Sequence, residues 1–296
     1  MGNTIAMTLS FPSPAKVNRF LHITGRREDG YHLLQTLFHF LDYGDELCVS
    51  LREDNQICLF PESHLGISQE NNLIYKAAKK LQLASSSHLG ANIHWQKRLP
   101  LGSGLGGGSS NAATCLFALN LLWDLKWSQA QLMALGLTLG ADVPVFLFGH
   151  SALAQGIGEE CVAIEMPATW FLVITPDCMV ETAKMYAKSE LTRNTPTLRI
   201  GALAKDGMSQ ALANCRNDFE PVVRRHYPEV DNALKWLSNY GEARLSGSGA
   251  SVFACFSSQE QAQDVAERMP PLMKGFIAKG MNQSPLMQSA MSKGFI

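Results

Sequence analysis

The fold is decided by one stretch, Pro100-Leu101-Gly102-Ser103-Gly104-Leu105-Gly106-Gly107-Gly108-Ser109-Ser110-Asn111, which runs directly into an apolar segment at residues 112–123. Glycine adopts a positive φ without strain, so successive N–H groups can point at one spot and bind an anion. The apolar segment predicts a buried helix, whose free N–H groups and dipole add to that attraction. We therefore interpret the stretch as a phosphate-binding loop, with Ser109, Ser110 and Asn111 as cap-type side chains at the helix start.

Two better-known glycine loops do not fit this stretch. It has no Gly-Lys-Ser or Gly-Lys-Thr, so it is not a Walker A loop. Gly102, Gly104 and Gly107 have the spacing of the dinucleotide fingerprint, but that motif also needs a second strand that ends in an acid about 20 residues on. Here Asp124 ends the apolar helix and another helix start follows at Ser128. A flexible linker is disfavoured because periodic apolar segments flank the loop on both sides.

The composition indicates a globular protein without a general nucleic-acid surface. The 296 residues are 46% hydrophobic and 17% charged, which is enough for one large or two ordinary domains. A formal net charge of −1 lacks the basic excess that nucleic-acid binding needs. The seven cysteines form no C-x-x-C pair, so we expect neither a zinc site nor a disulfide framework. We find no membrane-spanning run and no signal peptide, and we expect a cytoplasmic protein.

The first half of the chain reads as strands that lead into the glycine loop. We expect strands at residues 15–23, 46–51, 57–60 and 91–95, and a helix that starts at Asn72 and ends near residue 83. In the first strand, alternation places Lys16 and Asn18 on the same face. Residues 33–41 fit both the strand and the helix period, with a preference for strand. A capping box at Ser128 predicts a helix up to residue 139, which Gly140 can end in the left-handed conformation.

The second half begins with a hairpin around Gly156-Ile157-Gly158, with strands at 151–155 and 161–164. Further strands are expected at 171–175, 243–245, 252–256 and 276–279, and helices at 182–190, 198–214, 230–239 and 258–269. The strands at 243–245 and 252–256 flank a second glycine loop, Ser246-Gly247-Ser248-Gly249-Ala250-Ser251. We expect the tail after residue 285 to be frayed. This mixture predicts two α/β domains, residues 1–160 and 161–296.

Three blocks, in this order and at these distances, resemble the GHMP kinases, the superfamily of galactokinase, homoserine kinase, mevalonate kinase and phosphomevalonate kinase. The blocks are Pro-Ala-Lys16-Val-Asn18, the loop from Pro100 to Asn111, and the second glycine loop. The stretches at 26–32 (Arg-Arg-Glu-Asp-Gly-Tyr-His), 139–146 (Leu-Gly-Ala-Asp-Val-Pro-Val-Phe) and 275–286 are more specific. They are similar to the members that phosphorylate 4-diphosphocytidyl-2-C-methyl-D-erythritol, and this resemblance covers nearly the whole chain.

The resemblance implies a mixed α+β fold of two domains, the first like domain 2 of ribosomal protein S5 and the second ferredoxin-like, with the active site in the cleft between them. It implies ATP as co-substrate, Mg²⁺ as cofactor, and the non-mevalonate isoprenoid pathway. The first glycine loop, from Pro100 to Ser110, would bind ATP. The partners would be ATP and a cytidine-diphosphate-linked sugar alcohol, with no nucleic acid and no membrane, and the protein would be a monomer or a weak homodimer. The protein ligands of Mg²⁺ are left unassigned.

The resemblance makes Asp142 the base that accepts the proton of the attacking hydroxyl, and Lys16 the cation that stabilises the transferring phosphoryl group. By the residues alone, other interpretations stay open. An aspartate before Val-Pro is typical of a helix cap, and a lysine at a strand end is usually solvated. Asn18 would hydrogen-bond the substrate or be an exposed strand residue.

The resemblance also assigns the cytidine-binding residues. Tyr31 and His32 would contact the cytosine, Tyr186 would cover the opposite face of the base, and Thr182 would face the same pocket. Ile157 and the second loop at Gly247, Ser248 and Gly249 are also expected to bind the substrate. The sequence Glu181-Thr182-Ala183-Lys184 carries more charge than many members have there. Two alternatives are a kinase of the homoserine or mevalonate type, and a nucleotide-binding regulator without catalysis.

Overall fold

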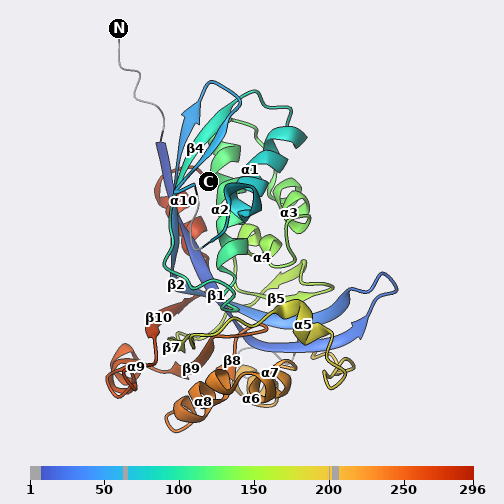
Figure 1. Ribbon diagram of the computed structural model, residues 1–296, viewed down its shortest axis with the longest axis vertical. Coiled ribbons are helices and arrows are strands. Elements are labelled where there is room, and N and C mark those ends of the chain that lie inside the picture. Colours follow the sequence, from blue (N-terminus) through green and yellow to red (C-terminus); the bar gives the residue numbers. More distant parts are fainter. Residues whose placement is uncertain (1–7, 63–65, 200, 202–206) are drawn as a thin grey trace.

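The computed structural model describes residues 8–62, 66–199, 201 and 207–296, and it is organised around one long antiparallel pair of strands (Figure 1). Strand β1, Thr8–Arg26, pairs with β2, His32–Arg52, along almost its whole length. The register shifts at three places, between Pro14 and Lys16, Asn18 and Leu21, and Ile23 and Gly25. Such shifts bend and twist a strand. The pair therefore runs through both parts of the molecule, and its closing turn projects from one side (Figure 1).

The strands form one mixed sheet. Its main path has the order β3-β4-β2-β10-β7-β9-β8, and β1 and β5 also pair with β2, while β6 pairs with β5. The remaining bounds are β3 Ile57–Phe60, β4 Gly90–Gln96, β5 Ala152–Gln155, β6 Glu160–Ala163, β7 Trp170–Ile174, β8 Arg244–Leu245, β9 Val252–Phe256 and β10 Gly275–Met281. All of these pairs are antiparallel except that between β3 and β4.

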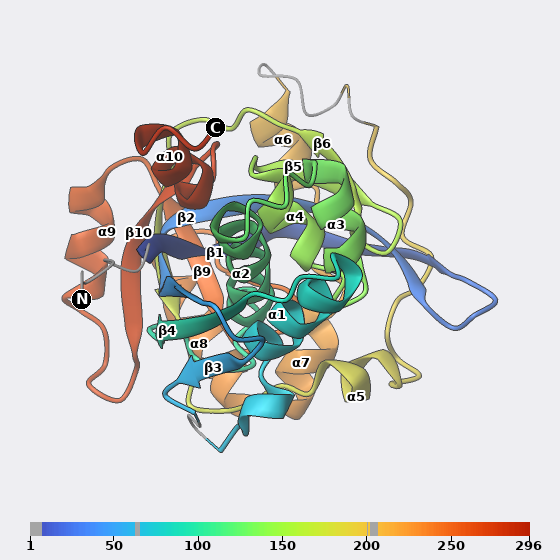
Figure 2. The ribbon, with the colours of Figure 1, turned by 90° about the horizontal axis from the view of Figure 1, so that it is seen from above.

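The helices gather in two groups on either side of the middle of the molecule. The first group is α1 Leu73–Ala84, α2 Gly107–Leu122, α3 Gln129–Leu137, α4 Val143–Phe148 and α10 Pro285–Ser292. The second is α5 Thr182–Tyr186, α6 Met208–Ala213, α7 Glu220–His226, α8 Pro228–Leu237 and α9 Gln259–Ala266. Seen from above, α2 lies at the centre of the first group, next to α1 and α4 (Figure 2). Most side chains of α2 are buried, as its apolar sequence predicts.

Separate hydrophobic cores support the two parts. The first joins α1, α2 and α4 to β2 and β4, with Leu116, Phe146 and Trp95 among its members. The second packs α7 and α8 against β7 and β9, and Leu21 and Ile23 of β1 belong to it. The long β1–β2 pair thus contributes to both cores, so the glycine loop before α2 and the hairpin turn beside α5 have fixed positions relative to each other.

Most expected elements are confirmed. Residues 33–41 are strand, and the expected strands at 15–23, 91–95, 171–175 and 252–256 lie within β1, β4, β7 and β9 to within one residue. The hairpin around Gly156 forms, with β5 paired to β6. Asn72 caps α1 with its side chain, and Ser128 forms the expected capping box at α3.

Several helix boundaries were wrong. Gly140 does not end α3 in the left-handed conformation, because the cap is Thr138 and Gly140 has no positive φ. The helix expected at 182–190 ends at Tyr186. The helix expected at 198–214 covers only Met208–Ala213 of the described residues, and positions 200 and 202–206 of that prediction lie outside them. Helix α7 was not expected, although Pro221 near its start is a usual start signal.

The expectation of a frayed tail was also wrong. Residues 285–292 form α10, which Ser284 caps through its side chain. Leu286 and Ala290 are fully buried in the first core, so the last helix returns to the N-terminal part of the fold. None of the helices in the described ranges has the length and apolar character that crossing a bilayer requires.

Candidate active site

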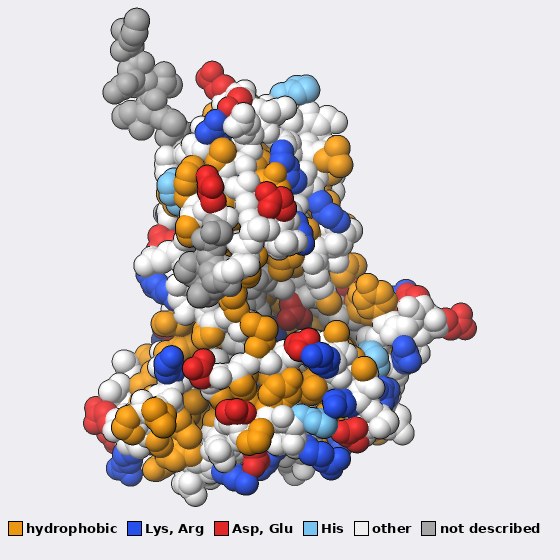
Figure 3. All heavy atoms as spheres, in the orientation of Figure 1, with side chains coloured by type: hydrophobic (Ala, Val, Ile, Leu, Met, Phe, Trp, Pro, Cys, Tyr) orange, Lys and Arg blue, Asp and Glu red, His pale blue; other side chains and the backbone are white. Residues whose placement is uncertain are grey.

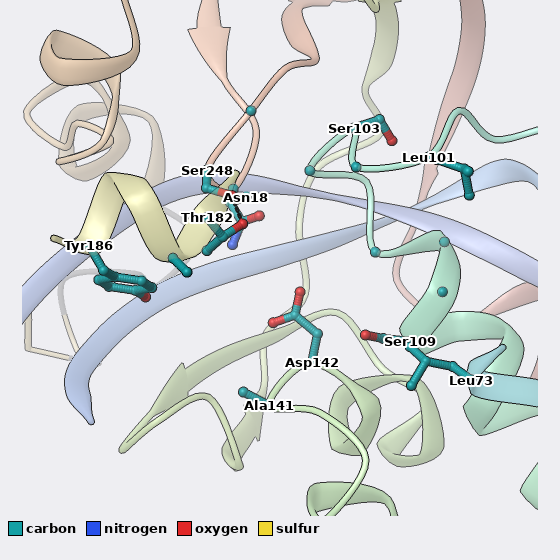
Figure 4. Close-up of a pocket in the computed structure, with 18 of the residues that line it drawn as sticks. Asn18, Leu73, Leu101, Ser103, Ser109, Ala141, Asp142, Thr182, Tyr186 and Ser248 are labelled. Carbon is teal, nitrogen blue, oxygen red and sulfur yellow. Dashed lines mark hydrogen bonds between the residues drawn. The ribbon is translucent and has the colours of Figure 1, made fainter. Parts of the chain in front are cut away.

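A cavity of about 1280 Å³ lies between the two parts of the molecule. The space-filling view shows the surface hollowed there (Figure 3), and the close-up shows the elements that surround it (Figure 4). Both glycine loops, the start of α4, helix α5 and the turn between β1 and β2 contribute to its wall. The expected site residues that line it are Lys16, Asn18, Tyr31, His32, Pro100, Leu101, Gly102, Ser103, Gly104, Gly106, Gly107, Gly108, Ser109, Asp142, Ile157, Thr182, Tyr186, Gly247, Ser248 and Gly249.

The first glycine loop has the backbone conformation that its glycines predict. Gly102, Gly104 and Gly106 have φ angles of 60°, 76° and 74°. Gly106 is the left-handed N-cap of α2, and a Cβ atom there would lie 2.8 Å from Cζ of Phe146. A side chain at this position would therefore be strained and would also clash with the first core.

The expected capping role of Ser109, Ser110 and Asn111 was wrong. The helix begins before them, at Gly107, and its N-cap has no side-chain hydrogen bond. Ser110 and Leu105 are fully buried, and they are the two expected ATP-binding residues that do not line the cavity. The serines are therefore part of the first turns of α2 and not its cap.

The two glycine loops are joined directly to each other. The Ser246 hydroxyl donates to the carbonyl of Gly104 over 3.0 Å, and the backbone N–H of Ser251 donates to the carbonyl of Ser103 over 2.9 Å. A Cβ atom on Gly104 would lie 2.1 Å from the Ser246 carbonyl oxygen. Only glycine allows this approach, so the two loops act as one wall of the cavity.

Lys16 and Asp142 meet in the cavity, although 126 positions separate their places in the chain. The Lys16 ammonium lies 3.2 Å from the Asp142 carboxylate, and it donates to Asn18 Oδ1 over 2.6 Å and to the Gly104 carbonyl over 3.2 Å. Lys16 is only 2% exposed, so it is not a solvated strand-end lysine. The Asp142 side chain is 36% exposed and points into the cavity (Figure 4).

Asp142 stands at the N-cap position of α4, but its side chain makes no capping hydrogen bond. The alternative interpretation as a helix cap therefore does not account for the carboxylate. Pro144, in the first turn of α4, supplies no N–H and has a φ suited to a helix start, so the helix can begin without a side-chain cap. The carboxylate is left to interact with Lys16.

Asn18 lies on the same face as Lys16, as expected, but it is buried and not exposed. Its amide oxygen accepts from Lys16, and its amide nitrogen donates to Thr36 Oγ1 over 2.8 Å. Both ends of the amide are engaged, so Asn18 fixes the direction of the lysine side chain. Contact of Asn18 with a substrate stays a prediction.

The aromatic residues gather at the other end of the cavity. The rings of His32 and Tyr186 are stacked, with centroids 4.4 Å apart and planes 20° from parallel. Tyr31, on the projecting turn, is 61% exposed. Thr182 Oγ1 lies 2.6 Å from Ser248 Oγ, which ties α5 to the second glycine loop (Figure 4). A nucleotide base therefore does not fit between the rings of His32 and Tyr186 in this arrangement. The exposed ring of Tyr31 remains as a surface on which a base can stack.

A buried carboxylate that the sequence analysis missed supports the first glycine loop. Asp45, with a fully buried side chain, accepts from Lys97 Nζ over 2.6 Å, from the N–H groups of Arg98 and Leu99 over 2.7 and 2.8 Å, and from Asn111 Nδ2 over 2.9 Å. Burial lowers the pKa of Lys97, and the Asp45 charge opposes that shift. Asp45 thus connects the chain before the loop to the second turn of α2.

The residues present fit a magnesium ion that is held mostly by phosphate oxygens. Among the described residues, no three histidine, cysteine or acidic side chains gather in a metal-binding cluster. Mg²⁺ in kinases usually keeps few protein ligands and is bound through substrate phosphates. Ser109 lines the cavity, and the buried hydroxyl of Ser110 has no hydrogen-bond partner among the described residues.

Comparison with known proteins identifies the class that this fold and site define. The model of the GHMP kinases N terminal domain matches residues 72–150, and that of the GHMP kinases C terminal domain matches residues 200–274. A crystal structure of homoserine kinase from Cytophaga hutchinsonii superposes with a TM-score of 0.67 at 19% identity, over 96% of this chain and 98% of that one, which shows the fold alone. The protein has the two-domain GHMP kinase fold, which combines α-helices with a mixed β-sheet.

Closer relatives narrow the class. The 4-diphosphocytidyl-2-C-methyl-D-erythritol kinase of Pseudomonas fluorescens is 50% identical over 95% of this chain and 96% of its own. That of Haemophilus influenzae is 51% identical over 94% of this chain and 87% of its own. A crystal structure of 4-(cytidine 5'-diphospho)-2C-methyl-D-erythritol kinase matches 92% of this chain and 99% of its own, with a TM-score of 0.78 and 32% identity. The chain belongs to the 4-diphosphocytidyl-2-C-methyl-D-erythritol kinase family, and it is an ATP-dependent kinase that acts on an alcohol.

Proposed function

We propose that this protein transfers the γ-phosphoryl group of ATP to a hydroxyl of 4-diphosphocytidyl-2-C-methyl-D-erythritol, giving the 2-phosphate and ADP, in the non-mevalonate isoprenoid pathway. The names of the relatives support the substrate. One observation carries the proposal: a buried lysine and a cavity-facing aspartate lie 3.2 Å apart beside two joined glycine loops.

Asp142 acts as the base. The substrate hydroxyl oxygen attacks the γ-phosphorus, its proton passes to the Asp142 carboxylate, and the bond to the β–γ bridging oxygen breaks to release ADP. A positioned base contributes about 10²–10⁴-fold to such a step. Lys16 stabilises the charge that develops on the transferring group, and Asn18 and the Gly104 carbonyl hold its ammonium in place.

The first glycine loop, Pro100 to Ser110, binds the triphosphate through backbone N–H groups and the start of α2. The positive φ angles of Gly102, Gly104 and Gly106 allow those groups to converge. Ser109, and Ser110 if its buried hydroxyl turns outward, would hold the Mg²⁺ that accompanies ATP. That ion neutralises phosphate charge when it is bound.

The cytidine end of the substrate binds at the aromatic end of the cavity. The exposed ring of Tyr31 stacks on the cytosine, and His32 forms a hydrogen bond with the edge of the cytosine. Tyr186 lies on the far side and must part from His32 to cover the base. Thr182, Ile157 and the second loop at Gly247, Ser248 and Gly249 complete the wall around the sugar alcohol.

Two alternatives compete with this proposal. Kinases of the homoserine or mevalonate type share only the fold at under 25% identity. A regulator without catalysis would have no need of a buried lysine directed at an aspartate. We also propose that the domains divide near residue 160, into 1–160 and 161–296, and that the enzyme works in the cytoplasm as a monomer or weak homodimer.

The test is ADP release by the purified protein with ATP and Mg²⁺. The cytidine-linked alcohol should give rapid release, homoserine and mevalonate should give none, and CMP should compete with the cytidine-linked alcohol. Binding of ATP and CMP without ADP release would favour the regulator, and release with homoserine or mevalonate would reassign the substrate.

A further inference from the structure

The chain just before α7 is hydrogen-bonded to β1 at one of the register shifts of that strand. The N–H of Leu21 donates to the carbonyl of Arg216 over 3.1 Å, and the N–H of Asp218 donates to the carbonyl of Leu21 over 2.8 Å. Asn217 lies between Arg216 and Asp218 in the chain, is 4% exposed and does not line the cavity. It therefore has a fixed position beside the strand that carries Lys16.

The side-chain amide of Asn217 connects the start of α7 to the end of β8. Its Nδ2 donates to the carbonyl of Leu245 over 2.9 Å and to that of Gly247 over 2.7 Å, and its Oδ1 accepts from the N–H of Phe219 over 2.9 Å. The N–H of Leu245 donates to Glu220 Oε2 over 3.0 Å. Both backbone groups of Leu245 are thus bonded to side chains of the segment 217–220, which take the place of a neighbouring strand.

The two carbonyls that accept from Asn217 belong to the residues on either side of Ser246, which is fully buried. The Ser246 hydroxyl accepts from the N–H of Asn18 over 3.4 Å and donates to the carbonyl of Gly104 over 3.0 Å. The same carbonyl accepts from the Lys16 ammonium over 3.2 Å. Ser246 therefore connects the strand that carries Lys16 to the first glycine loop, and it does not line the cavity.

We propose that Asn217 is a positioning residue for phosphoryl transfer and that it acts on Lys16 through Ser246. It fixes the backbone of Ser246, whose hydroxyl then holds the Gly104 carbonyl as an acceptor for the lysine ammonium. A carbonyl oxygen has two lone pairs, so the hydroxyl on one of them leaves the ammonium the other and sets its direction toward Asp142. The effect on catalysis rests on the proposed function, whereas the effect on the lysine does not.

The environment of the lysine ammonium is measured on the protein without ligand. Correlation spectra of a ¹³C,¹⁵N-lysine sample resolve the side-chain nitrogens, and Lys16→Arg assigns the signal of Lys16. We expect Asn217→Ala and Ser246→Ala to move this signal in the same direction, because both release the Gly104 carbonyl. Asn239→Ala makes the same exchange at an exposed residue that bonds only its own helix end, and it should leave the signal in place. A Lys16 signal that neither of the first two variants moves would overturn the proposal.

The effect on the reaction is measured as ADP release with ATP, Mg²⁺ and the cytidine-linked alcohol. Displacing a catalytic group by about 1 Å can cost about 10²-fold, so we expect Ser246→Ala and Asn217→Ala each to lower kcat by about 10–100-fold. Several N–H groups of the first glycine loop hold the triphosphate, so the KM for ATP should stay within about threefold. Asn239→Ala should keep the wild-type kcat. An unchanged kcat in Ser246→Ala, or a loss confined to the KM for ATP, would overturn the proposal.

The double variant with Asn217→Ala and Ser246→Ala distinguishes this role from general support of the fold. If Asn217 acts through Ser246, the double variant loses no more kcat than the weaker of the two single variants, because residues that act as a unit are not additive. A loss equal to the product of the two single losses would overturn the proposal. If Asn217→Ala does not fold, Ser246→Ala, which removes only a hydroxyl, decides by its Lys16 signal and its kcat. If wild type releases no ADP with the cytidine-linked alcohol, the proposed function fails, and the Lys16 signal still decides the role of Asn217.

Discussion

Replacing Asp142 by asparagine removes the proposed base while it keeps the size and shape of the side chain. The asparagine can still accept a hydrogen bond from Lys16, whose ammonium also keeps Asn18 Oδ1 and the Gly104 carbonyl as acceptors. The buried lysine is therefore not left without partners. We expect the free energy of unfolding to fall by about 1–2 kcal/mol at most.

The catalytic loss should be much larger than the loss of stability. A general base contributes about 10²–10⁴-fold, which corresponds to about 2.7–5.4 kcal/mol of transition-state stabilisation at 25 °C. The triphosphate is held by backbone groups of the loop around Gly104 and Gly106, which the substitution does not change. We therefore expect kcat to fall by this factor and the KM for ATP to stay within about threefold.

Steady-state ADP release at saturating cytidine-linked alcohol measures kcat, and titration calorimetry with a non-hydrolysable ATP analogue measures nucleotide binding. Asp177→Asn is the matched control, because it makes the same charge change at an exposed position that does not line the cavity. If the Asp142→Asn enzyme keeps kcat within threefold of wild type, Asp142 is not the general base. A loss of ATP affinity as large as the loss of kcat would show that the carboxylate acts on nucleotide binding.

Three further results are expected. Tyr31→Ala and His32→Ala should each raise the KM for the cytidine-linked alcohol at least tenfold more than the KM for ATP in steady-state kinetics, and equal effects on both would contradict the assignment of the aromatic end. Gly106→Ala should destabilise the protein by about 1–3 kcal/mol in urea unfolding and raise the KM for ATP, because φ is 74° and the new methyl would lie 2.8 Å from the Phe146 ring. Asp45→Asn should lower the free energy of unfolding by about 3–5 kcal/mol in the same urea assay and weaken ATP binding, because it leaves the buried ammonium of Lys97 without its carboxylate. Unchanged stability would show that the four hydrogen bonds to Asp45 do not support the loop.

Local patterns in the sequence predicted most of the elements. Apolar alternation located β4, a continuous apolar run located β7, and side-chain caps located the starts of α1 at Asn72 and of α3 at Ser128. These signals act between residues a few positions apart, so one sequence contains them in full. The glycine loop and the Lys16 face were also predictable, because positive φ angles and strand alternation are local properties.

Features that depend on distant contacts were not predictable in this way. Ser109 and Asn111 have side chains typical of helix caps, but the helix starts earlier, at Gly107. Asn111 instead donates to Asp45 of β2, which is distant in the chain. The tail after residue 285 was expected to fray because chain ends usually do, whereas it forms α10, and the neighbours of Leu286 in the first core lie far away in the chain. The contact of Arg193 with His32 joins positions 161 residues apart, and no local pattern predicts it.

The measurement that tests the account most directly is a crystal structure of the ternary complex with a non-hydrolysable ATP analogue and the cytidine-linked alcohol. We predict the β- and γ-phosphates on the N–H groups around Gly104 to Gly108, the γ-phosphate beside Lys16, and the acceptor hydroxyl within about 2.6–3.2 Å of the Asp142 carboxylate. A triphosphate bound away from this loop, or an acceptor hydroxyl out of reach of Asp142, would contradict the account.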